Sequence, residues 1–203
     1  MGVALAKRVF DLVLSSLGLL LLAPLLLGIA LAVKLDSPGP VFFRQQRVGR
    51  FGVPFRIHKF RTMRHETRPG EREITVGADP RITRVGAILR RRKLDELAQL
   101  IDVWLGTMSL VGPRPEVPRY VALYSPAMRE QVLAVRPGIT DPASLRFRNE
   151  SELLSRAADP EREYVEVVMP RKLALAVEYA QRPSLLGDVR ILWRTLCALL
   201  ARG

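Results

Sequence analysis

Two adjacent carboxylates, Asp95 and Glu96, follow a run of four basic residues at 90–93, with only Leu94 between them. If a helix begins near Lys93, the acidic pair lies in its first turn, where the helix dipole favours negative charge and lowers the pKa of a carboxyl group. Acidic first turns also occur in helices that carry no chemistry, and a short basic run is usually a solvated face. The same combination fits an anion pocket beside a site for a hard cation held by oxygen ligands.

Further basic side chains recur in rigid or turn-rich segments. Arg114 stands between Pro113 and Pro115, so its guanidinium is displayed at little entropic cost, which suits the recognition of phosphate or a base. Arg136 opens a Pro-Gly turn, and Arg148 follows it along the chain. These two arginines either join the anion site or are ordinary surface charges.

The elements that must position these side chains follow from local patterns. Residues 41–63 contain two strand-like runs, rich in aromatic and basic residues and separated by glycine and proline, which predicts a small β-hairpin. Apolar residues at helical spacing over 94–105 predict a helix that begins near Lys93. Asp79-Pro80 is a helix-start signal ahead of it, and the polar stretch 64–78 predicts a surface loop.

The N-terminal part of the chain is strongly apolar. Residues 12–33 carry no charge over 22 positions, which matches the length of a bilayer-crossing helix. A cleaved signal peptide is the alternative, but the apolar run is longer than a usual signal core and no small-residue cleavage pattern follows it. Pro24, in the middle of the run, removes a backbone donor and clashes with the carbonyl of Leu20, so we expect a break there.

Basic residues flank this apolar segment on both sides, with Lys7 and Arg8 before it and Lys34 and Arg44 after it. The positive-inside rule would keep both ends in the cytoplasm. A bent hairpin that enters and leaves by the same leaflet satisfies both flanks, and the alternative is a kinked helix that spans the bilayer. We therefore predict a re-entrant membrane hairpin over 1–36 and a cytoplasmic domain over 37–203.

The last segment, 185–202, places apolar residues on one broad side with arginines at its border. This pattern is typical of an amphipathic helix at an anionic membrane surface, and equally of a helix packed on a core. With the other predicted elements it gives an α/β fold that is mostly α, in which short strands and interfacial helices accompany the membrane hairpin.

Composition narrows the classes of function. The 203 residues carry a net charge of +12, which points to phosphate-bearing partners: nucleic acid, anionic lipid or a nucleotide substrate. One cysteine excludes an intramolecular disulfide framework, and two histidines leave too few ligands for a transition-metal centre. A membrane-anchored protein that binds nucleic acid or anionic lipid is the competing class, although Asp95 and Glu96 would repel a phosphate backbone.

The chain resembles the bacterial sugar transferase family, the small monotopic phosphoglycosyl transferases that act on polyprenyl phosphate. The segments that carry the resemblance occur in the family's order and cover nearly the whole chain: KRVFD (7–11), PVFFRQQRVGRFGVPFRIHKFRTM (40–63), DPRITRVGAILRRRKLDELAQL (79–100), MSLVGPRPEVP (108–118) and RPGIT (136–140).

The resemblance implies an activity and a set of roles. Members transfer a sugar 1-phosphate from a nucleotide sugar, usually a UDP-sugar, to polyprenyl phosphate such as undecaprenyl phosphate, and they release UMP. They use Mg²⁺ and a covalent aspartyl intermediate at the cytoplasmic face of the bacterial inner membrane, and they initiate exopolysaccharide, O-antigen or glycoprotein glycan assembly. Asp95 is then the nucleophile, Glu96 assists it at the metal or in proton handling, and nucleic acid is not a partner. The implied substrate-binding residues are Lys59, Arg61, Arg90, Pro113, Arg114, Pro115, Arg136 and Arg148, and Pro24 is the implied membrane break.

Several positions depart from the family pattern. Ala98 replaces a proline, Asp102 an asparagine and Thr107 an aspartate, and RPGIT continues as DPASLRFRNE. None of these changes affects Asp95 or Glu96. The last one lies where substrate contacts are expected, so the resemblance does not specify the sugar.

Overall fold

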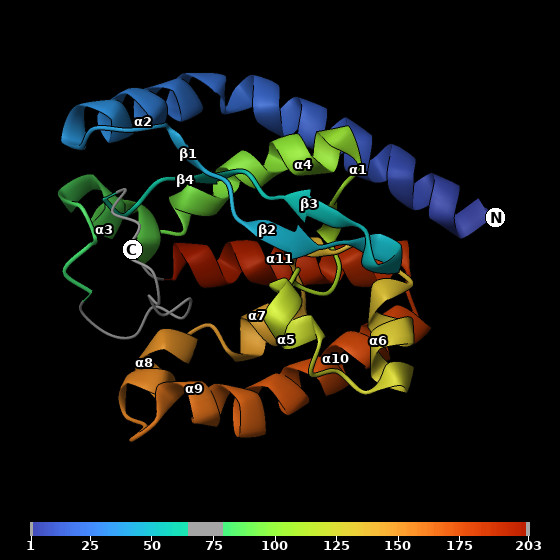
Figure 1. Ribbon diagram of the computed structural model, residues 1–203. Coiled ribbons are helices and arrows are strands. Elements are labelled where there is room, and N and C mark those ends of the chain that lie inside the picture. The colour runs from blue at the N-terminus through green and yellow to red at the C-terminus, as the bar shows by residue number, and fades with distance from the viewer. Residues whose placement is uncertain (1, 65–78, 202–203) are drawn as a thin grey trace.

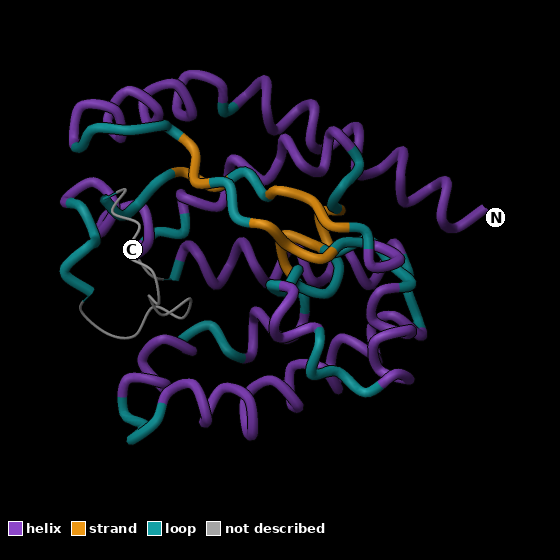
Figure 2. The backbone as a smooth tube through the Cα atoms, viewed as in Figure 1, coloured by secondary structure: helices purple, strands orange, loops and turns teal. Residues whose placement is uncertain are grey.

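The computed structural model describes residues 2–64 and 79–201. The protein is mostly helical with a few short strands, as predicted (Figures 1 and 2). The predicted surface loop lies outside the described residues apart from Arg64, and so does Arg202 of the predicted last helix.

The N-terminal apolar segment forms two helices, α1 (Gly2–Leu21) and α2 (Ala23–Asp36), which bend by 64° at Leu22. Pro24 lies in the first turn of α2, where its missing N–H removes no helical hydrogen bond. The predicted break near Pro24 is therefore confirmed. Among the described helices none is long and apolar enough by itself to cross a bilayer, whereas α1 and α2 together meet that criterion as a bent pair.

The arm α1 packs along α4 and β5 through polar contacts (Figure 1). Asp11 is buried and accepts a hydrogen bond from the backbone N–H of Leu110 at 3.1 Å. Arg8 donates to the carbonyls of Val103 and Trp104, at the C-terminal end of α4. The hairpin therefore does not stand apart from the rest of the chain.

The arm α2 contributes Ile29 and Val33 to a core cluster with Phe60, Leu89 and Ala98. The opposite face of the hairpin exposes large apolar side chains, among them Leu5, Val9, Leu20, Leu21, Leu27, Leu31 and Leu35. The hairpin is thus amphipathic as a whole, with one face on the protein body and one apolar face uncovered.

Four short strands follow α2. β1 (Phe42–Phe43) pairs antiparallel with β4 (Lys59–Phe60), and inside this pair β2 (Gln46–Val48) pairs antiparallel with β3 (Pro54–Arg56). The turn is a 3₁₀ segment, η1 (Arg50–Gly52), in which Phe51 and Gly52 have positive φ. The predicted β-hairpin is confirmed.

A third two-stranded sheet, which the sequence patterns did not predict, pairs β5 (Ser109–Val111) in parallel with β6 (Gly138–Thr140). The two backbones come so close that a Cβ on Gly138 would lie 2.1 Å from the nitrogen of Gly112. Glycine is therefore required at this contact.

The acidic pair lies between two helices and not at the start of one long helix. α3 (Arg84–Arg91) begins with Thr83 as its N-cap, so the helix start predicted at Asp79-Pro80 is wrong: Asp79 accepts hydrogen bonds from Arg81 instead. Lys93 then adopts a left-handed conformation with φ 56°, and a 3₁₀ segment, η2 (Leu94–Gln99), leads into α4 (Leu100–Leu105).

The remaining helices build the middle and lower parts of the molecule in Figure 1. They are α5 (Pro118–Val121), α6 (Pro126–Leu133), α7 (Pro142–Arg146), α8 (Glu150–Ser155), α9 (Pro160–Glu163), the π-helical segment η3 (Tyr164–Val168), α10 (Met169–Gln181) and α11 (Leu185–Leu200). Proline in the first turn of α5, α6, α7, α9 and α10 suits positions whose N–H groups lack helical partners.

The last helix, α11, crosses the middle of the molecule in Figure 1. Its inner side contacts α7, β5 and β6, and carries the buried Asp188, which pairs with Lys7 of α1 at 2.5 Å. Leu186, Trp193 and Leu200 on its other side are exposed. The predicted amphipathic helix is confirmed over 185–200, with one face on the core and a second apolar face uncovered.

Candidate active site

Asp95 is held at the beginning of η2 by a turn that reverses the chain after α3. Its side chain is only 3% exposed, and the Nζ of Lys59, from β4, lies 2.9 Å from Oδ2. The other oxygen, Oδ1, is buried and has no hydrogen-bond partner in the described part of the chain. Because an unsatisfied buried carboxylate oxygen is costly, this atom is a candidate for contact with a ligand.

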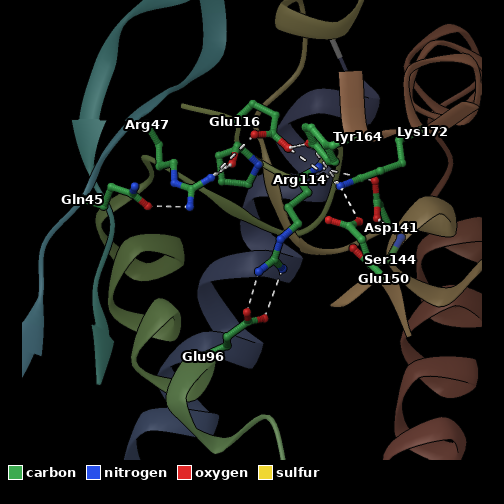
Figure 3. Close-up of polar contacts among 11 residues, drawn as sticks. Gln45, Arg47, Glu96, Arg114, Glu116, Asp141, Ser144, Glu150, Tyr164 and Lys172 are labelled. Carbon is green, nitrogen blue, oxygen red and sulfur yellow. Dashed lines mark hydrogen bonds and ion pairs between the residues drawn. The ribbon is translucent and has the colours of Figure 1, made fainter. Parts of the chain in front are cut away.

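Glu96 is bound on both oxygens by a fork from Arg114. Nη1 donates to Oε2 at 3.1 Å and Nη2 to Oε1 at 2.5 Å (Figure 3). Lys59 Nζ lies 3.3 Å from Oε1. Burial alone would raise the pKa of Glu96, but the charges of Arg114, Lys59 and Lys93 and the Arg114 hydrogen bonds hold it well below its ordinary value. Glu96 is therefore ionised at neutral pH.

Arg114 reaches Glu96 from the proline-rich segment that follows β5. Its backbone N–H donates to Asp141 Oδ2 at 3.4 Å, and Asp141 caps α7 through the N–H of Ser144. Pro113 and Pro115 line a small pocket in which Arg114 also takes part, and they are absent from the wall of the large cavity. The two prolines therefore shape the segment, and the arginine is the group that faces the cavity.

A cavity of about 560 Å³ has Glu96 and Arg114 on its wall, and Asp95, which does not itself line the cavity, contacts Lys59, which does. Its wall includes four of the predicted substrate-binding residues, Lys59, Arg90, Arg114 and Arg148, together with Glu96. Leucines from η2, α4 and α11 form an apolar part of the same wall: Leu97, Leu100, Leu192, Leu196 and Leu199. The arrangement can hold a polyanion next to a buried carboxylate, with an apolar surface close by.

Two of the predicted substrate-binding arginines lie elsewhere. Arg61 is buried and donates to the carbonyls of Val33, Ser37 and Pro38, because the end of α2 leaves carbonyls without helical partners. Arg136 donates to the carbonyl of Gly106, just after α4. Neither arginine lines the cavity; both are bound to backbone carbonyls, and their predicted role in substrate binding stays a prediction.

The residues that could hold a metal ion are few. The described residues contain no group of three or more His, Cys, Asp or Glu side chains that could enclose one. Mg²⁺ commonly needs only one or two carboxylates when substrate phosphates and water supply its other ligands. Asp95, with its unpartnered Oδ1, and Glu96 beside it fit that mode of binding.

Comparison with known proteins agrees with the motifs. The family model described as bacterial sugar transferase matches residues 3–202. The chain belongs to the bacterial sugar transferase family.

Named relatives of this transferase cover nearly all of its chain. A UDP-glucose:undecaprenyl-phosphate glucose-1-phosphate transferase from Caulobacter vibrioides is 42% identical, over 98% of this chain and 71% of its own length. An enzyme of the same name from Escherichia coli is 40% identical over 95% of this chain, which spans only 39% of the relative. The exopolysaccharide production protein PSS of Rhizobium leguminosarum bv. phaseoli is 41% identical, over 97% of this chain and 96% of its own.

One departure from the family pattern has a partner in the transferase structure. Asp102 is buried in α4, and its carboxylate accepts the backbone N–H of His58 at 2.7 Å and contacts His58 Nδ1 at 2.8 Å. His58 directly precedes Lys59. Asp102 therefore anchors the strand that carries the lysine to Asp95 and Glu96.

The sequence analysis missed a second group of polar residues on the cavity wall, which includes Gln45, Arg47, Glu116, Glu150, Tyr164 and Lys172 (Figure 3). Glu116 follows the proline-rich motif directly, and that position was a usable signal. Tyr164 and Lys172 lie in a segment with no motif, and only the fold brings them to the cavity.

Proposed function

We propose that this protein transfers a sugar 1-phosphate from a UDP-sugar to undecaprenyl phosphate, releases UMP, and so begins the assembly of an exopolysaccharide or related glycan. The observation that carries the proposal is the position of Asp95. This buried carboxylate has one oxygen on Lys59 and the other without a protein partner, next to a cavity lined by cationic side chains. The names of relatives at about 40% identity support the same reaction.

The reaction runs as two displacements at one phosphorus atom. A carboxylate oxygen of Asp95 attacks the phosphorus that bears the sugar, and the bond from this phosphorus to the bridging oxygen breaks, so UMP leaves with that electron pair. An oxygen of undecaprenyl phosphate then attacks the same phosphorus and releases Asp95. The two steps let one site serve a soluble donor and a lipid acceptor in turn.

The remaining side chains of the site position Asp95 and neutralise the negative charge of the phosphate oxygens. Lys59 orients Asp95 and reaches Glu96, and Arg114 and Arg90 supply positive charge where phosphate oxygens carry the developing charge. Asp95 and Glu96 would hold Mg²⁺ together with the diphosphate, and the ion would supply further charge neutralisation. The leucine-lined wall from α11 suits the first isoprene units of the acceptor.

The protein is a monotopic protein of the bacterial inner membrane, on its cytoplasmic face. Lys7 of α1 contacts Asp188 and Val33 of α2 lies in the core, so both ends of the bent hairpin start from the protein body. A hairpin whose two ends return to one body enters and leaves the bilayer by the same leaflet. The exposed apolar faces of the hairpin and of α11 are the surfaces that contact lipid.

The competing class, a membrane-anchored binder of nucleic acid or anionic lipid, has no observation in its favour. The basic cavity wall encloses Glu96 and adjoins Asp95, which a phosphate-backbone binder would not need.

The deciding experiment supplies the purified protein in nanodiscs with Mg²⁺, undecaprenyl phosphate and a panel of UDP-sugars. We expect release of UMP that depends on the acceptor in steady state. Release of UDP would indicate transfer of the sugar without its phosphate and would contradict the proposal.

A further inference from the structure

A second polar cluster lines the same cavity as Arg114 and Glu96 (Figure 3). Its centre is Glu116, which accepts a hydrogen bond from the hydroxyl of Tyr164 and lies 3.8 Å from both Arg47 and Lys172. Lys172 also donates to Glu150 at 2.9 Å. We call Arg47, Glu116, Glu150, Tyr164 and Lys172 the Glu116 cluster.

Burying the charged groups of this cluster costs free energy of folding. The side chains of Glu116 and Lys172 are only 13% and 14% exposed, and Tyr164 is buried. Buried ion pairs are often no more stabilising than apolar residues of the same volume, so stability alone does not account for them. Tyr164 also begins the π-helical segment η3, a kind of irregularity that is frequent at functional sites.

Two buried polar atoms beside the cluster have no hydrogen-bond partner among the described residues. They are Nε of Arg47, a donor, and Oγ of Ser144, which both donates and accepts. Arg47 and Ser144 both line the cavity. Unsatisfied groups at the wall of a cavity are candidates for contact with a bound ligand.

The charge of the cluster differs from that of the wall around Arg114. Arg47 and Lys172 balance Glu116 and Glu150, so the cluster is neutral in sum and offers both donors and acceptors. Hydroxyl groups, which both donate and accept, are matched by such a mixture. A uracil ring, with two carbonyl acceptors and a single N–H donor, would use the two cations but only one of the two carboxylates.

One rigid segment sets the distance between the two parts of the cavity. Arg114, Pro115 and Glu116 are consecutive, so the Cα atoms of Arg114 and Glu116 are at most roughly 7 Å apart. A sugar is bonded directly to the phosphate that Asp95 attacks, so its ring lies next to the phosphate-binding part. The Glu116 cluster therefore lies close to the position of the sugar ring, because only Pro115 separates Glu116 from Arg114 in the chain.

We propose that the Glu116 cluster, with Ser144, is the subsite that recognises the hydroxyl groups of the transferred sugar and sets the preference among UDP-hexoses. This inference rests on the proposed function, because it concerns the donor of that reaction.

The test compares Glu116→Gln with the wild-type protein and with Glu166→Gln, which makes the same chemical change at an exposed residue paired with Arg162. For each protein one measures kcat/KM for the two UDP-hexoses that the wild type uses best, and the inhibition constant of UMP. We expect Glu116→Gln to change the ratio of the two kcat/KM values by about tenfold or more, with the UMP constant unchanged within about twofold. Glu166→Gln should leave both unchanged.

Other outcomes overturn the proposal. An unchanged ratio would exclude a role in sugar recognition, and a UMP constant weakened about tenfold with an unchanged ratio would assign the cluster to the nucleoside. If Glu116→Gln does not fold, Ser144→Ala serves the same test, because the deleted hydroxyl has no protein partner.

Failure of the proposed function is visible separately, as absence of UMP release by the wild type. In that case calorimetry tests the subsite, through the difference between the binding free energy of a UDP-hexose and that of UMP. That difference must shrink in Ser144→Ala if the cluster recognises the sugar, and an unchanged difference would refute it.

Discussion

The chain interrupts its helices at two places that differ in cause. Between α1 and α2 the break at Leu22 precedes Pro24, a residue that cannot continue a helix. Between α3 and η2 the break is at Lys93, an ordinary residue held at φ 56°. For a residue other than glycine this left-handed conformation costs about 1–2 kcal/mol.

The two breaks have different consequences. The proline break bends an apolar hairpin so that both arms rest on the protein body. The lysine break turns the chain so that Asp95 enters the interior beside Lys59. Backbone strain therefore coincides with the chemistry, as is common where surrounding contacts over-determine a site.

The largest expected effect tests the chemistry at the lysine break. Asp95→Asn removes the proposed nucleophile, so UMP release should fall by about a thousandfold or more. With UDP-sugar and no acceptor, mass spectrometry should find a phosphosugar adduct on the tryptic fragment that begins at Leu94 in the wild type, and none in the variant.

Asp79→Asn is the matched control, because Asp79 pairs with Arg81 and does not line the cavity. It should keep both turnover and the adduct. Turnover by Asp95→Asn near the wild-type rate would refute the assignment of the nucleophile.

A smaller effect tests the electrostatics of the same break. Arg114→Gln removes the largest of the charges that lower the pKa of Glu96, so the pKa rises while Lys59 and Lys93 still oppose the effect of burial. In the wild type the ionised form of Glu96 is lost only when the pH falls through a strongly lowered pKa, so the acid limb of activity lies at low pH. In the variant we expect this limb to move to higher pH, with a loss of about 10–100-fold in kcat/KM at neutral pH.

The measurement is a pH profile of kcat/KM from about pH 5 to about pH 8, compared with Arg129→Gln, which changes an exposed arginine on α6. A uniform loss at every pH, with no shift of the limb, would show that Arg114 acts on the substrate alone and not through Glu96.

The proline break is tested by determining on which side of the membrane the N-terminus lies. Pro24→Ala restores a backbone donor and removes a clash, which favours a continuous helix by about 3 kcal/mol. The contacts of Lys7 and Asp11 with the body oppose this change, so we expect a minority of molecules to place the N-terminus on the far side of the membrane.

Labelling of a cysteine introduced at Ala4 reports that fraction, in a Cys197→Ser background with a cysteine at the exposed Ser155 as reference. In the parent protein both positions should react from the same side. Opposite sides in the parent would mean a spanning helix and would remove the basis of the comparison.

The sequence predicts a region well where local interactions determine its structure, and poorly where distant contacts do. Pro24 and the alternation of residues 41–63 act locally, so the break and the β-hairpin were predictable. Lys59, Arg114 and the acidic pair were identified through the family motifs, and the structure brings them together.

Features that depend on distant contacts were not predictable. No local signal in the sequence predicts the left-handed Lys93, because lysine is not a residue type that favours positive φ. Arg61 resembles a substrate-binding arginine in sequence, yet it caps α2 from 24 residues away. Tyr164 meets Glu116 across 48 residues, a separation at which residue types alone indicate no contact.

The smallest expected effect asks whether Lys93 is strained. Glycine adopts positive φ without a Cβ clash, whereas a β-branched residue is a severe outlier there. Lys93→Gly and Lys93→Val both remove the charge, so their difference isolates the backbone. We expect the valine variant to unfold about 2–4 °C or more below the glycine variant in the same detergent. Equal Tm values would mean that the turn relaxes out of the left-handed region when lysine is replaced. The lysine break would then be set by its side-chain contacts, and the contrast with the proline break would lie in side-chain packing and not in the backbone.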